Sequence, residues 1–175
     1  MYEENDYSTL RFEVTGELRH AIVGWGFDNI DENDVYSNIN HPHVGREDNT
    51  HCTVMYNIVD TVPEQVLKVL AGEPSFTIEL GDISIFENEM YDVIKINVMG
   101  DALNRLYRVA INSLSHNKVF FDFDPHLTIA FVKKHKGKQI IEKIKKNKFS
   151  GKKFKVEELC FNKYRPNEMI IDLAT

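Results

Sequence analysis

The sequence predicts an α+β fold in which two pseudo-symmetric βαβαβ lobes flank a central cleft. Three observations support this prediction. The order of strand and helix patterns repeats along the chain, the joints between elements match, and one histidine motif recurs at the same place in each repeat. We expect a single domain over residues 1–175, with lobe one at about 1–88 and lobe two at about 89–175, because a chain of 175 residues suits one domain.

Apolar periodicity places the elements of both halves in the same order. In lobe one we expect strand Thr9–Val14, helix Glu17–Ile30, a long polar loop Asp31–Thr50, strand His51–Ile58, helix Pro63–Ala71 and strand Ser75–Phe86. In lobe two we expect strand Asp92–Val98, helix Asp101–Ser115, strand His126–Val132, helix Lys138–Lys148 and strand Phe154–Phe161, followed by a last strand Met169–Leu173. The joints Thr15-Gly16-Glu17 and Met99-Gly100-Asp101 each leave a strand through glycine and open a helix with an acid, which favours the helix N-terminus.

The second strand of each half begins with the same pattern, His-x-Thr-aliphatic-x-aromatic. It reads His51-Cys52-Thr53-Val54-Met55-Tyr56 in lobe one and His126-Leu127-Thr128-Ile129-Ala130-Phe131 in lobe two. The chain's composition would give about 0.3 His-x-Thr triplets by chance, before the aliphatic, the aromatic and the equivalent positions are required. The duplicated motif therefore indicates a shared site between the lobes.

This motif points to phosphodiester chemistry without a metal or other cofactor. Residues i and i+2 of a strand project from the same face, so each histidine should point into the cleft together with its threonine. One neutral imidazole of the pair His51 and His126 can accept a proton while the other, charged, donates one. The hydroxyls of Thr53 and Thr128 are suited to hold non-bridging phosphate oxygens. The residues alone leave open which histidine is the base.

With its paired His-x-Thr strands in a duplicated chain, the sequence resembles the 2H phosphoesterase superfamily, which includes RNA 2′,3′-cyclic phosphodiesterases and 2′,5′ RNA ligase-like proteins. The run Asp34-Val35-Tyr36 and the run Gly45-Arg46-Glu47-Asp48, just before the first motif, are similar to LigT-like proteins carried by phages. Some members of that branch, the anti-CBASS nucleases, degrade the cyclic oligonucleotide messengers of bacterial immunity.

The resemblance implies a bilobal fold with His51, Thr53, His126 and Thr128 as the catalytic residues. It also implies a small ribonucleotide substrate, a cyclic di- or trinucleotide, whose 2′-hydroxyl takes part in the chemistry. RNA ends with 2′,3′-cyclic phosphates remain an alternative substrate, and a non-catalytic nucleotide-binding module remains an alternative function. No obligate protein partner is evident.

Substrate-binding candidates outside the motif are Tyr7, Arg46, Phe161 and Lys163. An aromatic ring near the cleft would stack on a base, and the guanidinium of Arg46 would either meet a phosphate or anchor its loop. We expect Tyr56 and Phe131 to pack in the core, because strand alternation turns them away from the histidines. Trp25 is also expected in the core.

The composition is that of a globular protein, with 42% hydrophobic and 27% charged residues. No apolar run is long enough for a membrane span and the N-terminus is acidic, so we expect a cytoplasmic location, the host cytoplasm if the gene belongs to a phage. Two distant cysteines predict neither a disulfide framework nor a zinc site, and His41-Pro42-His43 suggests a turn rather than a metal site.

Charge is distributed unevenly along the chain. The stretch Lys133–Lys155 holds eleven lysines and one acid, whereas the whole chain has a net charge of −6. Ile140, Ile141 and Ile144 recur at helical spacing, so a solvated helix face accounts for part of this stretch. The lysines would also attract a polyanionic substrate. The loop Asp31–Thr50 is long enough to be either a lid or plain irregular structure.

Overall fold

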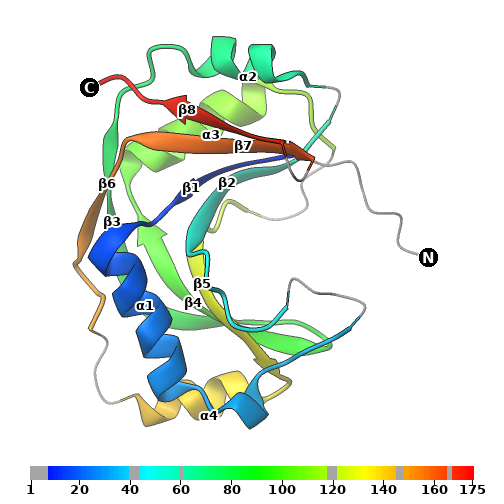
Figure 1. Ribbon diagram of the computed structural model, residues 1–175, viewed down its shortest axis with the longest axis vertical. Coiled ribbons are helices and arrows are strands. Elements are labelled where there is room, and N and C mark those ends of the chain that lie inside the picture. Colours follow the sequence, from blue (N-terminus) through cyan, green and yellow to red (C-terminus); the bar gives the residue numbers. More distant parts are fainter. Residues whose placement is uncertain (1–7, 40–43, 60, 118–121, 145–147, 165–166) are drawn as a thin grey trace.

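A computed structural model (Figure 1) describes residues 8–39, 44–59, 61–117, 122–144, 148–164 and 167–175, with the side chains of residues 163, 164 and 167 left out. The elements, in chain order, are β1 Ser8–Glu13, α1 Gly16–Asn29, the 3-10 turn η1 Glu32–Asp34, β2 His51–Ile58, α2 Pro63–Leu70, β3 Phe76–Glu87, β4 Tyr91–Met99, α3 Asp101–Ser113, β5 His126–Lys133, α4 Lys136–Lys143, β6 Lys153–Val156, β7 Glu158–Tyr164 and β8 Asn167–Asp172. The predicted α+β class is confirmed, and the predicted order of elements is confirmed except at one strand.

One predicted strand is two strands in the structure. The expected strand Phe154–Phe161 is divided at Glu157 into β6 and β7, which belong to different sheets. The carbonyl of Glu157 accepts a hydrogen bond from the amide of Leu173 at 2.8 Å. The chain therefore passes from one sheet to the other at this residue.

The strands form two antiparallel four-stranded sheets whose orders correspond, β2-β1-β7-β8 and β5-β4-β3-β6. The third strand of the first half, β3, pairs with β4 of the second half, while β7 pairs with β1. The two halves thus exchange strands, so the expected boundary near residue 88 does not separate the sheets. The physical reason is that β1 and β4, the first strands of the two halves, each have one edge that is not paired within their own half. Strand β7 pairs with that edge of β1, and β3 pairs with that edge of β4.

The helices are exchanged in the same way (Figure 1). Helix α1 packs against β5 and α3 against β2, with α2 beside α3 and α4 against β3, β4 and β5. Helix α1 buries Ile22, Trp25 and Gly26 on one face, which confirms the core position predicted for Trp25. A methyl group at Gly26 would lie 3.0 Å from Cγ2 of Ile129, so this glycine lets α1 approach β5 closely. One hydrophobic core joins both sheets.

Parts of the loop predicted over Asp31–Thr50 are fixed to the outer edge of β5. The amide of Tyr36 donates to the carbonyl of Phe131 at 2.9 Å, and the amide of Phe131 donates to the carbonyl of Gly45 at 2.7 Å. The amide of Glu47 donates to the carbonyl of Ile129 at 2.9 Å. Both described arms of the loop therefore pair with β5 and cover an edge strand that would otherwise be exposed. Residues 40–43 lie outside the described part.

Helix α4 confirms the solvated face predicted within the lysine-rich stretch. Ile140 is buried, whereas most described lysines around it are exposed or half-buried. Several of these lysines form ion pairs, namely Lys134–Asp92, Lys136–Asp34, Lys138–Glu87 and Lys155–Glu157. Capture of a polyanion by this stretch stays a prediction.

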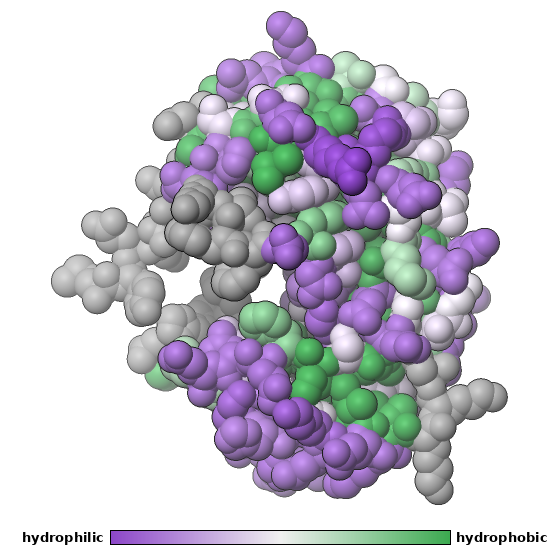
Figure 2. Space-filling view, turned by 180° about the vertical axis from the view of Figure 1, so that it is seen from behind, coloured by the Kyte–Doolittle hydropathy of each residue, from purple (hydrophilic) through white to green (hydrophobic). Residues whose placement is uncertain are grey.

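The face of the molecule opposite to that in Figure 1 is mostly hydrophilic, with apolar side chains exposed in separate patches (Figure 2). Scattered patches of this kind are ordinary on globular proteins. Among the described residues, no helix has both the length and the apolar character needed to cross a bilayer.

Candidate active site

The two motif strands, β2 and β5, lie side by side in the middle of the molecule (Figure 1). In both strands the histidine and the threonine are half-buried, while the residue between them is fully buried, Cys52 in β2 and Leu127 in β5. Strand alternation therefore projects His51 with Thr53, and His126 with Thr128, from the faces opposite the core, as predicted.

Both histidine rings are held in the same way. Nδ1 of His51 lies 2.7 Å from the carbonyl oxygen of Asn49, and Nδ1 of His126 lies 2.7 Å from the carbonyl oxygen of Asp124. A carbonyl oxygen only accepts, so each Nδ1 must carry the proton and donate it. In the neutral ring this leaves Nε2 unprotonated, and Nε2 is then the atom available for proton transfer.

The surroundings of the two rings are not equivalent. Burial lowers the pKa of His126 below its ordinary value, and the charges of Lys95 and His51 lower it further, against the Asp124 carbonyl and carboxylate, which raise it. The contribution of His51 indicates that the two imidazoles are close enough to influence each other. His126 is therefore neutral at pH 7, with a free lone pair on Nε2.

A β-bulge in each motif strand reverses the strand alternation after the threonine. On β2, Thr53 lies opposite Arg11 and Met55 opposite Leu10, so Val54 is the extra residue. On β5, Thr128 lies opposite Lys95 and Ala130 opposite Ile94, so Ile129 is extra. The bulges occupy equivalent motif positions, and each turns the following aromatic residue to the face that carries the histidine.

The prediction that Tyr56 and Phe131 pack in the core is therefore wrong. Tyr56 is 37% exposed and Phe131 is half-buried, and both line a pocket of about 470 Å³. The same pocket is bordered by His126 and Thr128 of the second motif, and by Thr53 of the first. The strand alternation on which the prediction rested is broken by the bulges.

Two further aromatic rings in this pocket come from outside the motifs. Tyr107 on α3 and Phe123, in the segment before β5, stack with their ring centroids 4.1 Å apart and their planes 4° from parallel. Burial, with smaller effects from Tyr56 and Asp122, raises the pKa of Tyr107, so its phenol stays protonated. Sequence reasoning missed this pair and had no signal for it, because one residue follows a helical period and the other lies in a loop.

Arg46 acts as an anchor, the second of its two predicted roles, because most of its N–H donors are bound within the protein. Its Nη1 donates to the carbonyl of Gly26 at 2.7 Å, and its Nη2 donates to the carbonyl of Ile30 at 2.7 Å. The guanidinium also pairs with Glu32 at 3.1 Å and lies over the Phe27 ring at 4.9 Å. It thus closes the C-terminal end of α1.

Of the other predicted substrate contacts, Phe161 alone has a described side chain, and that side chain does not reach the pocket. Phe161 is 0% exposed, because β7 pairs with β1 and turns this ring into the core instead of bordering the second motif. The prediction of Phe161 as a base platform is therefore wrong. Lys163 lies on β7, but its side chain is outside the described residues, as is all of Tyr7.

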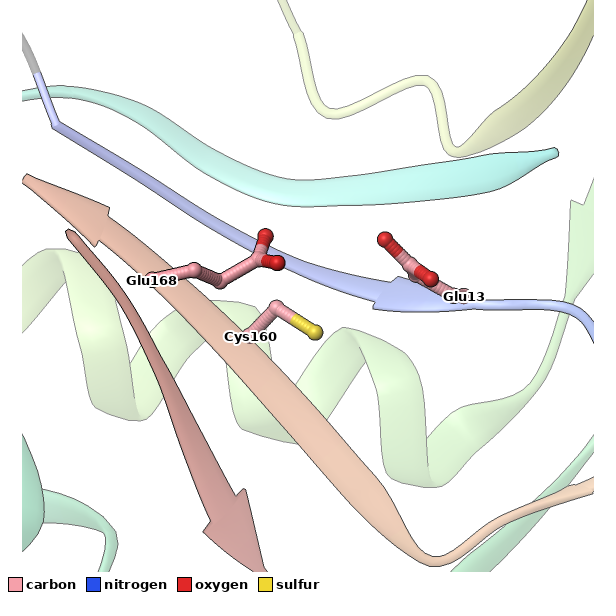
Figure 3. A group of neighbouring side chains, drawn as sticks. All are labelled: Glu13, Cys160 and Glu168. Atoms are coloured by element: carbon pink, nitrogen blue, oxygen red, sulfur yellow. The ribbon is translucent and has the colours of Figure 1, made fainter. Parts of the chain in front are cut away.

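A cluster of Glu13, Cys160 and Glu168 comes from the adjacent strands β1, β7 and β8 (Figure 3). Arg11 is bound to both carboxylates, at 3.1 Å to Glu13 and 2.7 Å to Glu168. Burial raises the pKa of the Cys160 thiol to about 11, so it is protonated at neutral pH. The contacts fit an ion-pair network centred on a guanidinium better than a metal site. The turn predicted at residues 41–43, which the sequence favoured over a metal site, lies outside the described part.

Comparison with known proteins agrees with this geometry. The family model of the 2′-5′ RNA ligase superfamily matches residues 38–168. No curated protein matches the chain by sequence.

Solved structures share the fold at low identity. E. coli LigT complexed with 3′-AMP aligns with a TM-score of 0.60 and 17% identity over 95% of this chain and 94% of its own. Kluyveromyces marxianus Usb1 with uridine monophosphate aligns at 0.59 and 10% identity over 96% and 98%. The Thermus thermophilus protein TT0787 aligns at 0.56 and 14% identity over 95% and 94%. These likenesses show the bilobal fold.

The family model spans both His-x-Thr motifs and most of the chain, and the two motif strands meet as the fold requires. The chain therefore belongs to the 2′-5′ RNA ligase superfamily and is a 2H phosphoesterase, an enzyme of the phosphodiesterase class.

Proposed function

We propose that this enzyme cleaves ribonucleotide phosphodiester bonds by two-histidine acid–base catalysis, with His126 as general base and His51 as general acid. The observation that carries the proposal is the matched pair of hydrogen bonds from Nδ1 to a carbonyl oxygen, which leaves Nε2 of both rings for proton transfer. The lowered pKa of His126 supports its assignment as the base. His51 is then the acid.

The reaction balances without a further co-reactant. Nε2 of His126 takes the proton of a ribose 2′-hydroxyl, and the resulting oxygen attacks phosphorus. The bond from phosphorus to the 5′-oxygen breaks, and that oxygen takes a proton from His51. The hydroxyls of Thr53 and Thr128 donate to the non-bridging oxygens and stabilise the charge that develops there. Water can open the resulting 2′,3′-cyclic phosphate with the histidine roles exchanged.

The aromatic pocket supports the proposal of a nucleotide substrate, and its position next to His126 indicates how that substrate would be oriented. A pocket of about 470 Å³ is of ligand-binding size, and Tyr56, Phe131 and the Tyr107–Phe123 stack offer faces for a nucleobase. Because His126 borders this pocket, a base seated there would bring its own ribose 2′-hydroxyl next to the proposed general base. The leaving nucleotide would then lie on the side of His51.

Among ribonucleotides we propose a cyclic oligonucleotide messenger of anti-phage defence as the substrate. The support is the similarity of residues 34–36 and 45–48 to phage LigT-like proteins. LigT has been solved with 3′-AMP and Usb1 with uridine monophosphate, so two proteins of this fold accept single nucleotides. An RNA end bearing a 2′,3′-cyclic phosphate uses the same four residues and is the alternative substrate.

The test is a substrate panel in the presence of EDTA. The protein and the variants His51→Ala and His126→Ala are incubated with cyclic dinucleotides, cyclic trinucleotides, 2′,3′-cyclic mononucleotides and 2′-deoxy analogues. We expect turnover in chelator by the parent protein alone, and none of the deoxy analogues. Binding without turnover by the folded parent would overturn the proposal in favour of a binding module, and equal cleavage of deoxy analogues would refute attack by the 2′-hydroxyl.

A further inference from the structure

The carbonyl that orients His126 belongs to a residue that is itself held by a buried cation. Nζ of Lys95, on β4, donates to Oδ2 of Asp124 at 2.6 Å, and the Lys95 side chain is only 7% exposed. Asp124 thus makes two contacts at once, one through its carboxylate to Lys95 and one through its main-chain oxygen to Nδ1 of His126.

The first half of the molecule builds an equivalent chain of contacts from different residues. Nδ2 of Asn49 donates to Oε1 of Glu13 at 2.8 Å, and Nη2 of Arg11 donates to the same oxygen at 3.1 Å. The main-chain oxygen of Asn49 accepts from Nδ1 of His51. Arg11 is further fixed by Glu168, at 2.7 Å. The carbonyl that orients His51 is therefore also tied to a cation, but through an additional residue, Glu13.

The two cations occupy the same place relative to the motifs. Arg11 on β1 lies opposite Thr53 of β2, and Lys95 on β4 lies opposite Thr128 of β5. Each is thus one strand away from the threonine of its motif, next to the bulge. The contacts of Arg11 and those of Lys95 thus involve different residue types but have equivalent positions in the two halves of the protein. Two chance ion pairs would not be expected to show this correspondence.

We propose that Arg11 and Lys95 are positioning residues that fix the two histidines with Nδ1 protonated and Nε2 open to the substrate. The proposal rests on the two-histidine function above and adds residues that touch neither substrate nor reacting atoms. A carbonyl that is held in place keeps accepting from Nδ1, so the opposite tautomer, with its proton on Nε2, is disfavoured. That tautomer has no lone pair at Nε2 and could not act as a base.

The effect of Lys95 can be measured, because its charge also changes the pKa of His126. The groups that influence the ring are Lys95 and His51, whose charges lower the pKa of His126, and Asp124, whose carbonyl and carboxylate raise it. Removal of the Lys95 charge should therefore raise the pKa of His126, whereas removal of the Asp124 charge should lower it. The two charges alone account for these opposite shifts, so the tautomer of the His126 ring is the property that distinguishes a positioning role from a purely electrostatic one.

The experiment follows ¹⁵N NMR titrations of the histidine rings in the 175-residue chain without substrate. The variants are Lys95→Met, the conservative Lys95→Arg and Asp124→Asn, which changes a 61% exposed side chain and should fold. Lys134→Met is the matched control, because it breaks another Lys–Asp pair, at 3.2 Å, between the residue just after β5 and Asp92 on β4. Nδ1 and Nε2 shifts report the tautomer directly.

We expect Lys95→Met to raise the pKa of His126 and to increase its Nε2-protonated tautomer, and to lower kcat/KM by about 10- to 100-fold. Lys95→Arg should restore most of the activity, Asp124→Asn should lower the pKa of His126, and Lys134→Met should change neither quantity. A tautomer of His126 that is unchanged in Lys95→Met would overturn the inference, whether or not its pKa shifts. Because no substrate is present, this result is independent of whether the proposed function holds.

Discussion

Helix α1 packs closely on the bulge of β5, so alanine substitutions at its two glycines, Gly24 and Gly26, should differ in their effect on stability. At Gly24 an added methyl group would meet nothing within 4 Å, whereas at Gly26 it would lie 3.0 Å from Cγ2 of Ile129. Ile129 is the extra residue of the bulge, is 2% exposed, and has its carbonyl bound by the amide of Glu47. It therefore has little room to move.

The change in folding free energy caused by each substitution is the sum of two opposing effects. Glycine-to-alanine replacement inside a helix stabilises by about 0.5–1 kcal/mol, and both Gly24→Ala and Gly26→Ala should share this gain. Overpacking costs about 1–3 kcal/mol and falls on Gly26→Ala alone. Gly26→Ala should thus be less stable than Gly24→Ala by about 1–3 kcal/mol, a difference in Tm of roughly 2–12 °C for a chain of this size.

Thermal unfolding followed by circular dichroism, together with kcat/KM, checks this prediction. A displaced bulge moves Thr128 and Phe131, so Gly26→Ala should also lose activity while Gly24→Ala keeps it. Gly24→Ala is the matched control for helix propensity. Equal Tm values for the two variants would refute the claim that α1 rests on the bulge and sets its geometry.

Three further outcomes are expected. Tyr56→Leu should raise KM by about 5- to 150-fold through lost base stacking, with little effect on kcat, as steady-state kinetics would show. The rising limb of kcat/KM against pH should lie below about pH 6.5, because the base must be neutral and burial lowers the pKa of His126; a rising limb above pH 7 would contradict its role. Arg46→Met should lower the free energy of unfolding by about 2–3 kcal/mol, measured by urea titration, because two carbonyls at the end of α1 lose their donor. If Arg46 instead contacted a substrate phosphate, the substitution would raise KM and leave the stability unchanged.

Local patterns were sufficient to predict most of the secondary structure and the motif pairs. The strand His51–Ile58 was placed without error, since its boundaries coincide with the start of a strong motif and the end of an apolar run. The shared faces of His51 with Thr53 and of His126 with Thr128 depend only on strand alternation, and they are confirmed by the burial of Cys52 and Leu127.

What the sequence did not reveal depends on pairing between distant segments. The bulges at Val54 and Ile129 are visible only in the register with β1 and β4, and they reversed the predicted orientation of the motif aromatics. The exchange of β3 and β7 between the sheets likewise follows from edge pairing, and it buried Phe161 instead of placing it at the cleft. Neither effect leaves a trace in local periodicity.

A ribonucleotide substrate with sulfur in place of the bridging 5′-oxygen tests the central claim most directly, because a thiolate leaves without a proton. With this substrate, we expect His51→Ala to recover to within about tenfold of the parent protein, while His126→Ala remains inactive. Recovery of His126→Ala instead, or of neither variant, would contradict the assignment of His51 as acid and His126 as base.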